Sequence, residues 1–243
     1  MKTTIIVPTY NEAENLEKLV TAVLALPLPD LSMLIVDDNS PDGTGEMAEQ
    51  LGVQYDGRVK VLHRAGKMGL GTAYIEGFRF AIEDGAEAIG QMDADFSHPI
   101  DKIVELAETL ESCDVVIGSR YVPGGSLDER WPIWRKALSR FGNFYARTIL
   151  GLPNRDVTGG FRLWRRETLQ NLPLERVRSN GYVFQVEMNY LASRLGYTFK
   201  EIPIYFQERR FGTSKMSFKI QMEAAIRTWQ LPGMYKDLPK LKK

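Results

Sequence analysis

Five short apolar runs recur at regular intervals in the first half of this chain, and this repeat constrains the fold more than any other feature. The runs cover residues 4–7, 33–36, 59–62, 88–92 and 115–117. They start about 26 to 29 residues apart, and each gap carries a helical pattern of apolar residues. Strands that alternate with helices at this spacing form a mostly parallel sheet with helices on both faces. We therefore expect a doubly wound α/β domain.

Charge and cysteine content exclude several classes of protein. The 243 residues carry 31 basic and 31 acidic side chains, so no global positive field favours nucleic acid as a partner. The single cysteine, Cys113, precludes an internal disulfide bond, and the N-terminus lacks the pattern of a secretory signal. Prolines or charges interrupt every long apolar stretch, so no transmembrane segment is predicted. We expect a cytoplasmic protein that meets any membrane from its surface.

The start of the first helix is predicted from its capping pattern. Asn11 stands where a helix cap is preferred, and Glu14 stands three residues later, as in a capping box. We therefore expect the Asn11 side chain to cap this helix.

The second half is less regular. Pro123 opens an irregular segment that carries Trp131 and Trp134, and we interpret this segment as a mobile lid. A helix is predicted over residues 137–150 and a final strand over 199–206. An amphipathic helix then presents Phe218, Met222, Ala225, Ile226 and Trp229 on one face, and a tail with Lys236, Lys240, Lys242 and Lys243 follows.

Two interpretations of this C-terminal part remain open. The helix either docks on the domain, with a frayed end beyond it, or lies on an acidic lipid surface. For the domain organisation we predict one domain over residues 1–230 and a basic tail over 231–243.

Two carboxylates follow the fourth predicted strand, in the sequence Asp93-Ala94-Asp95. Aspartates at a strand end often cap the next helix, but at the mouth of a parallel sheet two carboxylates also hold a hard divalent cation against a diphosphate. We expect Asp95 to bind Mg²⁺ or Mn²⁺, Asp93 to support the metal or a ribose, and Ser97 to add an oxygen. His98 is expected to turn the chain, because imidazole suits such a cation poorly.

A second acidic pair, Asp37 and Asp38, follows the second strand. An acid at this position accepts hydrogen bonds from a ribose or a base in dinucleotide folds, and the alternative is capping of the turn before Ser40. Tyr10 adds a stacking face and Glu12 a hydroxyl acceptor on the same side of the site.

Separated cations form the third group. Arg120 follows the fifth strand, Arg135 and Ser139 lie four residues apart on a predicted helix, and Arg209 and Lys215 flank a glycine turn with two hydroxyl residues. Cations on a helix often form a solvated face, but arginine forks and lysine charges also bind phosphate oxygens. We expect these residues to contact phosphate.

Six ordered motifs span the chain to about Phe218, at residues 7–12, 36–44, 93–99, 118–121, 156–162 and 209–215. Together they resemble the motifs of dolichol- or polyprenyl-phosphate mannose synthases, which are family 2 glycosyltransferases with a GT-A fold. One departure is the Gly159-Gly160 pair, where many relatives have Ser-Gly. Many relatives also carry C-terminal transmembrane helices, and this sequence shows a short basic tail instead.

The resemblance implies a role for each matching residue. The nucleotide of the donor would contact Pro8, Tyr10, Glu12, Val36, Asp38, Asp93, Ala94, Arg120, Arg209 and Lys215. The metal would bind Asp93, Asp95 and Ser97, and Asp95, Arg135, Ser139, Arg209 and Lys215 would form the catalytic group.

The resemblance also implies a reaction, in which mannose passes from GDP-mannose to dolichyl or polyprenyl phosphate with inversion. The partners would be these two substrates, a membrane surface on the cytoplasmic face and a small membrane-anchoring subunit. Two alternatives remain: transfer of glucose from a UDP-sugar to a polyprenyl phosphate, and a non-catalytic subunit that binds a nucleotide sugar.

Overall fold

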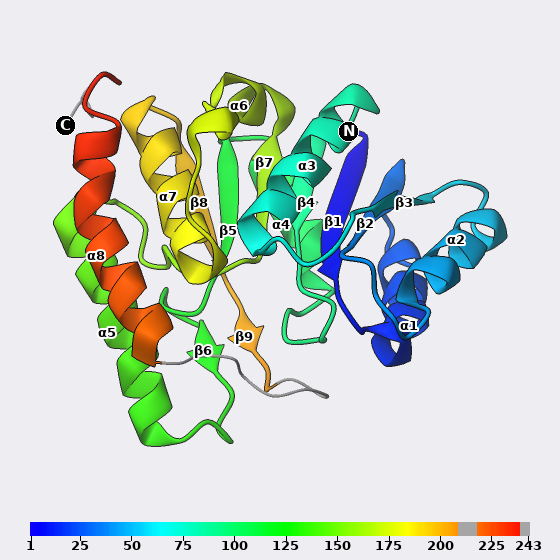
Figure 1. Ribbon diagram of the computed structural model, residues 1–243, viewed down its shortest axis with the longest axis horizontal. Helices are drawn as coiled ribbons and strands as arrows, with labels where there is room; N and C mark the ends of the chain where they lie inside the picture. The colour runs from blue at the N-terminus through cyan, green and yellow to red at the C-terminus, as the bar shows by residue number, and fades with distance from the viewer. Residues whose placement is uncertain (209–217, 239–243) are drawn as a thin grey trace.

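The structure is a computed structural model that describes residues 1–208 and 218–238 (Figure 1). Within these residues, a seven-stranded sheet has the order β3-β2-β1-β4-β7-β5-β8, and β6 pairs with β9 beside it. The strands are β1 Thr3–Thr9, β2 Leu31–Asp37, β3 Val59–His63, β4 Ala88–Gln91, β5 Val115–Ser119, β6 Ser126–Leu127, β7 Arg162–Arg165, β8 Phe199–Pro203 and β9 Tyr205–Phe206. All five strands predicted in the first half are present, so the expected α/β fold is confirmed.

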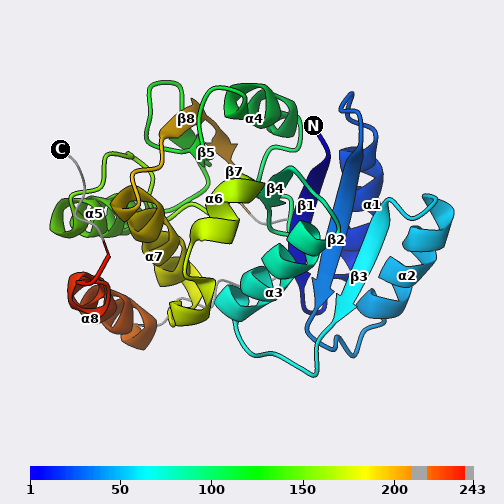
Figure 2. The same cartoon turned by 90° about the horizontal axis from the view of Figure 1, so that it is seen from above.

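Helices cover both faces of this sheet. They are α1 Ala13–Leu24, α2 Thr44–Gln54, α3 Leu70–Glu83, α4 Lys102–Leu110, α5 Ile133–Leu150, α6 Arg166–Asn171, α7 Gly181–Arg194 and α8 Phe218–Met234, with a 3₁₀ turn at Leu174–Arg176. Figure 2 shows α3 and α7 on one side of the sheet and α4 on the other.

Alternating residues of each strand divide the core into two layers. On β1, Ile6 packs with Phe78 of α3, whereas Ile5 and Val7 pack with Leu16 of α1. Burial of apolar side chains on both faces accounts for the nearly continuous apolar runs of the parallel strands. Cys113 is buried in this core, and burial raises the pKa of its thiol.

One strand of the sheet escaped the sequence prediction. β7 runs antiparallel between β4 and β5 and contains Arg162 and Arg165. Arg162 is fully buried because three backbone carbonyls, those of Val157, Gly159 and Gln185, accept its guanidinium N–H groups. Charged residues at both ends of a four-residue strand hide it from an apolar pattern.

The capping prediction at the first helix was wrong. Asn11 has a left-handed backbone, with φ of 60°, and the cap position belongs to Glu12. The Asp42 carboxylate accepts the Ala13 N–H at 3.1 Å. The helix is thus stabilised by a side chain from the turn after β2, a contact that local sequence does not reveal.

The segment expected to form a lid is anchored to the rest of the molecule. β6 pairs in parallel with β9, and the Trp131 side chain is buried, with its ring edge-on to Phe206 at a centroid distance of 5.8 Å. α5 begins at Ile133, four residues earlier than predicted, so Trp134 lies on the helix and is exposed.

The C-terminal helix α8 packs beside α5 at one end of the molecule (Figures 1 and 2). Leu231 and Thr228 of α8 are buried, whereas Met222, Ile226 and Trp229 of the predicted apolar face are 47%, 54% and 65% exposed. The expected helix is present, but that face is largely uncovered. No helix in the described part of the chain combines the length and apolar character that crossing a bilayer requires.

Candidate active site

Three neighbouring strands end at the same edge of the sheet, and the acidic motifs follow them. β1 lies between β2 and β4, with Pro8 opposite Val36 in the register. Because parallel strands share the direction of their carboxyl ends, the segments at 8–12, 36–38 and 93–95 leave the sheet side by side. The topology therefore brings together the residues expected to bind a nucleotide and those expected to bind a metal.

The turn from Asp93 to Ser97 offers oxygen atoms. Asp95 is 6% exposed, and its Oδ1 accepts the Ser97 N–H at 3.0 Å. The Ser97 Oγ is buried and has no hydrogen-bond partner among the described residues. In that same part of the chain, no three His, Cys, Asp or Glu side chains form a metal cluster. Two carboxylates and a hydroxyl are nevertheless oxygen donors of the kind that a hard divalent cation prefers, provided that its remaining oxygens come from a substrate and water.

His98 supports this turn. Its Nδ1 accepts the Asp93 N–H at 3.1 Å, and its ring stacks on Phe161 with a centroid distance of 5.0 Å. These contacts fit the expectation that His98 turns the chain.

The acidic pair after β2 has two distinct roles. Asp37 accepts hydrogen bonds from Thr9 and from the N–H and hydroxyl of Ser40, so it takes the capping role. Asp38 instead forms an ion pair with Arg64, with an Nη1 to Oδ1 distance of 2.6 Å. Burial raises the pKa of Asp38 above its ordinary value, although Arg64 opposes that rise.

Sequence reasoning missed Arg64. Its side chain is 1% exposed and also donates to Thr72 at 2.6 Å. The signal that was available is its position directly after β3, the strand that neighbours β2.

Tyr10 and Glu12 belong to the same group of residues expected to bind the nucleotide. Tyr10 is 36% exposed, and the Lys67 Nζ lies 4.2 Å from its ring centroid. The Glu12 carboxylate accepts a hydrogen bond from the Asn15 amide at 2.8 Å. The side chains of Val36 and Ala94 are buried, which leaves their backbone groups as the atoms that could contact a ligand.

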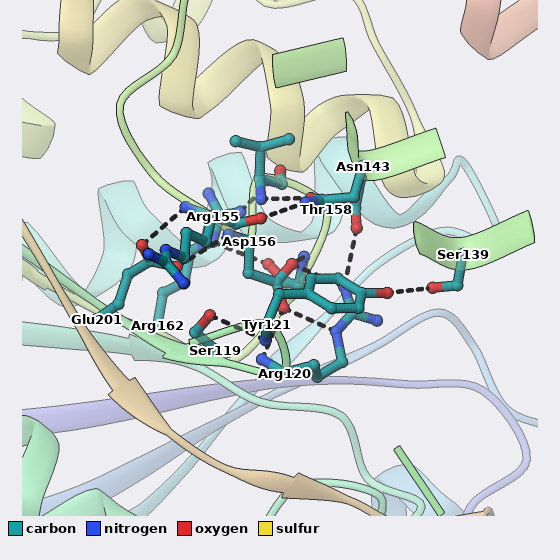
Figure 3. A network of polar contacts seen from close by, with 12 residues as sticks. Ser119, Arg120, Tyr121, Ser139, Asn143, Arg155, Asp156, Thr158, Arg162 and Glu201 are labelled. Carbon is teal, nitrogen blue, oxygen red and sulfur yellow. Dashed lines mark hydrogen bonds and ion pairs between the residues drawn. The ribbon is translucent and has the colours of Figure 1, made fainter. Parts of the chain in front are cut away.

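Arg120 and Asp156 form a buried two-point ion pair, drawn at the centre of Figure 3. The Nε to Oδ2 distance is 2.7 Å and the Nη2 to Oδ1 distance is 2.8 Å, and Nη2 also donates to Thr158. Burial acts to raise the pKa of Asp156, but the charge and hydrogen bonds of Arg120 outweigh it and hold that pKa below its usual value. The guanidinium expected to contact phosphate is therefore already fixed by a carboxylate.

The same carboxylate organises its surroundings. The Gly159 N–H donates to Asp156 Oδ1 at 2.9 Å, and Glu201 accepts the N–H groups of Arg155 and Asp156 (Figure 3). Asp156 thus acts as a rigid anchor for the loop between α5 and β7.

Arg135 and Ser139 lie on one face of α5, as predicted from their spacing. The Arg135 guanidinium stacks on the Trp131 ring at 3.6 Å from its centroid and pairs with Glu208 at 2.9 and 3.1 Å. The Ser139 hydroxyl shares a 2.7 Å hydrogen bond with the Tyr121 hydroxyl (Figure 3).

A cavity of about 540 Å³ lies between α5, α7 and α8. Arg120, Arg135 and Ser139 line it together with apolar and aromatic side chains, among them Phe141, Tyr182 and Val186. Two further lining residues reach the acidic motif: the Phe206 ring lies 5.4 Å from the His98 ring, and the Gln207 N–H donates to the Ser97 carbonyl at 3.1 Å. The cavity and the acidic turn are therefore directly adjacent.

Two of the predicted site residues, Arg209 and Lys215, lie outside the described residues. Glu208, which binds Arg135, is the last described residue before them.

The sequence matches known proteins over nearly its whole length. It is 44% identical over 240 residues to the undecaprenyl-phosphate mannosyltransferase of Micrococcus luteus, which covers 98% of each chain. It is 42% identical over 235 residues to the polyprenol monophosphomannose synthase of Mycolicibacterium smegmatis, over 96% of this chain and 88% of that protein.

Solved structures share the fold at low sequence identity. The mannosyl-3-phosphoglycerate synthase of Rubrobacter xylanophilus gives a TM-score of 0.69 at 15% identity, over 98% of this chain and 75% of that one. The glucosyl-3-phosphoglycerate synthase of Mycobacterium tuberculosis, in complex with Mn²⁺ and UDP-glucose, gives 0.65 at 16% identity, over 94% and 78%. The expected GT-A fold is confirmed.

The family model described as glycosyl transferase family 2 matches residues 4–172. This match covers more than half of the chain, and it includes the acidic turn, Arg120 and α5. The chain is an enzyme that belongs to glycosyl transferase family 2.

Proposed function

We propose that this protein transfers mannose from GDP-mannose to a polyprenyl or dolichyl phosphate, with inversion at the anomeric carbon. The products are GDP and a β-linked mannosyl phospholipid. The names of the two relatives support the transferred sugar and the class of acceptor. The donor nucleotide is our inference from the resemblance of the motifs.

One observation carries the proposal: the apolar cavity beside the acidic turn. A polyprenyl phosphate has an apolar chain and an anionic head, and this cavity combines aromatic walls with the Arg135 guanidinium and the Ser139 hydroxyl. Contacts of Phe206 and Gln207 with the acidic turn put the cavity next to the expected place of the donor diphosphate. An acceptor head and a donor sugar would thus meet between them.

The donor site would lie at the carboxyl edge of β1, β2 and β4. Tyr10 offers a face for the base, and Asp38, held by Arg64, offers a carboxylate to the ribose or to the N–H groups of guanine. The remaining contacts assigned to the nucleotide are those of Pro8, Glu12, Val36, Asp93, Ala94, Arg120, Arg209 and Lys215.

The oxygen donors of the acidic turn fit a divalent cation. Asp93, Asp95 and the Ser97 hydroxyl, which has no hydrogen-bond partner among the described residues, would hold Mg²⁺ or Mn²⁺, with the diphosphate and water as further ligands. When bound, such a cation neutralises charge on the departing GDP. Asp95 holds this turn in place by accepting the Ser97 N–H.

The acceptor side requires positioning more than proton transfer. A phosphate monoester has a second pKa of roughly 6, so it is mostly ionised near neutral pH and needs no strong base. Arg135, Ser139, Arg209 and Lys215 would bind it and offset its repulsion by the donor diphosphate. Asp156 is no candidate for a base, because Arg120 and two backbone N–H groups already occupy its carboxylate.

Peripheral contact with a membrane completes the proposal. Six large apolar side chains in the described parts of α5 and α8 are more than half exposed: Ile133, Trp134, Phe141, Phe144, Ile226 and Trp229. Aromatic side chains on amphipathic helices favour the membrane interface, and this face would bring the cavity to the lipid acceptor. Residues 1–230 would act as one domain, and the lysines of 231–243, with a small membrane-anchoring subunit, would add to the attachment.

A transfer assay tests this function. Purified protein is mixed with detergent, Mg²⁺ or Mn²⁺, undecaprenyl or dolichyl phosphate, and labelled GDP-mannose or UDP-glucose. We expect a labelled lipid from GDP-mannose. If only UDP-glucose gave a labelled lipid, the donor would be UDP-glucose and not GDP-mannose. If no combination of donor, lipid and metal gave a product, a subunit that only binds nucleotide sugars would be favoured.

A further inference from the structure

Tyr121 lies behind Ser139 and outside the wall of the cavity. Ser139 lines the cavity, Tyr121 does not, and the two hydroxyl oxygens are 2.7 Å apart. Figure 3 shows the Tyr121 ring directed from the Arg120 side toward Ser139. A group at this position can act on a ligand in the cavity through Ser139.

The Tyr121 ring is itself held in place. The Arg120 Cζ lies 5.2 Å from its centroid, and Arg120 is fixed in turn by Asp156 and Thr158. The Tyr121 N–H donates to the Ser119 hydroxyl at 3.3 Å. The buried ion pair of Arg120 with Asp156 therefore helps to fix the orientation of the Tyr121 ring.

The inventory of protons allows the Tyr121 phenol to be the donor of this hydrogen bond. Burial raises the pKa of the Tyr121 phenol above its ordinary value, so the phenol keeps its proton near neutral pH. A serine hydroxyl has one proton and two lone pairs. If the phenol donates to Ser139, the serine proton is left to donate elsewhere, and the cavity adjoins that hydroxyl.

We infer that Tyr121 is a positioning residue, which donates to Ser139 and so directs the Ser139 proton at the phosphate of the acceptor. This inference rests on the proposed function, because it takes the cavity to hold an anionic acceptor. It assigns a role to a residue that touches neither the donor nor the acceptor. Ser139 is then a donor with a fixed direction, which suits a phosphate oxygen better than a freely rotating hydroxyl.

Tyr121→Phe tests the inference, since it removes one oxygen and keeps the ring over Arg120. We expect the KM for a short-chain polyprenyl phosphate to rise about 5- to 10-fold, the effect of one hydrogen bond. The kcat and the dissociation constant for GDP stay close to wild type. Ser139→Ala gives a similar rise, and the double variant Tyr121→Phe with Ser139→Ala rises no further than either single variant.

A matched control is available at a distance from the site. The phenol of Tyr55, directly after α2, and the hydroxyl of Thr21, on α1, share a 2.9 Å hydrogen bond. Tyr55→Phe removes the same type of contact and leaves the acceptor KM unchanged.

Three results separate the possible failures. An unchanged acceptor KM in Tyr121→Phe, or losses that multiply in the double variant, would overturn the inference alone. A parallel loss of kcat, GDP affinity and thermal midpoint would show a merely structural role and overturn it as well. A wild-type protein that neither binds nor uses any polyprenyl phosphate would remove the proposed function, and the inference with it.

Discussion

Arg120 and Asp156 meet in a two-point ion pair with no exposed carboxylate surface, at 2.7 and 2.8 Å. Asp156→Asn would leave the Arg120 charge buried and unbalanced, close to the buried Arg162. We expect a loss of about 3–5 kcal/mol in the free energy of unfolding, measured by urea denaturation. Asp237→Asn, which breaks an exposed pair with Arg176, serves as the control and leaves the midpoint near wild type. Equal effects of the two variants would contradict this account of the ion pair.

The same pair predicts a pH dependence. The folded-state pKa of Asp156 is below its ordinary value, so the ionised carboxylate stabilises the fold at neutral pH. This stabilisation is complete above the unfolded-state pKa, about 4, and is lost as the pH falls through the folded-state pKa. We expect the difference in unfolding free energy between wild type and Asp156→Asn to shrink as the pH drops below about 4. If this difference in unfolding free energy stayed constant down to the acid transition, the ionised Asp156 would not be the source of the stabilisation.

The Arg135–Glu208 pair predicts competition with the acceptor. Glu208 holds the Arg135 guanidinium at 2.9 and 3.1 Å, and an acceptor phosphate would have to displace or share this contact. Glu208→Gln removes the negative charge that competes with the phosphate, while the Arg135 guanidinium still stacks on the Trp131 ring. Because partly exposed pairs are worth about 1 kcal/mol or less, we expect the acceptor KM to fall up to about fivefold. Steady-state kinetics with varied acceptor check this, and a rise in KM would show that Glu208 assists binding.

The Asp38–Arg64 pair predicts an effect on the donor. Asp38→Asn keeps the shape of the side chain but removes its charge. If the carboxylate accepts a hydrogen bond from the nucleotide, the variant loses about 1.5–3 kcal/mol of binding free energy for GDP. We expect the GDP dissociation constant from calorimetry to rise at least about tenfold. Asp56→Asn, in the exposed turn between α2 and β3, is the matched control with no change. GDP affinity that is equal in both variants would remove Asp38 from the nucleotide site.

The regular half of the fold was predictable because four of its parallel strands, β1, β2, β4 and β5, are buried on both faces. Its apolar runs mark β1 to β5, and the topology then fixes which carboxyl ends meet, so the acidic motifs could be placed at one edge from sequence. β7 was not predictable, since the burial of its Arg162 depends in part on the Gln185 carbonyl, 23 residues further along the chain. The same limit applies to the Asp42 contact that caps α1.

Within the candidate site, residue types and spacing identified the cations but not their partners. Arg135 and Ser139 could be placed on one helix face from their spacing, whereas Glu208, 73 residues beyond Arg135, could not be paired with it. Asp38 was assigned without Arg64, and Arg120 without its bond to Asp156. These partners come from other strands and loops, and their pairing depends on the folded topology.

In the proposed function, the acidic turn binds a divalent cation that activates the donor. The most direct measurement is turnover of GDP-mannose with a short-chain polyprenyl phosphate, by wild type with and without chelator and by Asp95→Ala with saturating Mn²⁺ or Mg²⁺. We predict that the chelator abolishes turnover of the wild type reversibly and that Asp95→Ala, which removes both a metal ligand and the acceptor of the Ser97 N–H, lowers kcat by at least about 100-fold. Full activity of Asp95→Ala, or of metal-free wild type, would contradict the account.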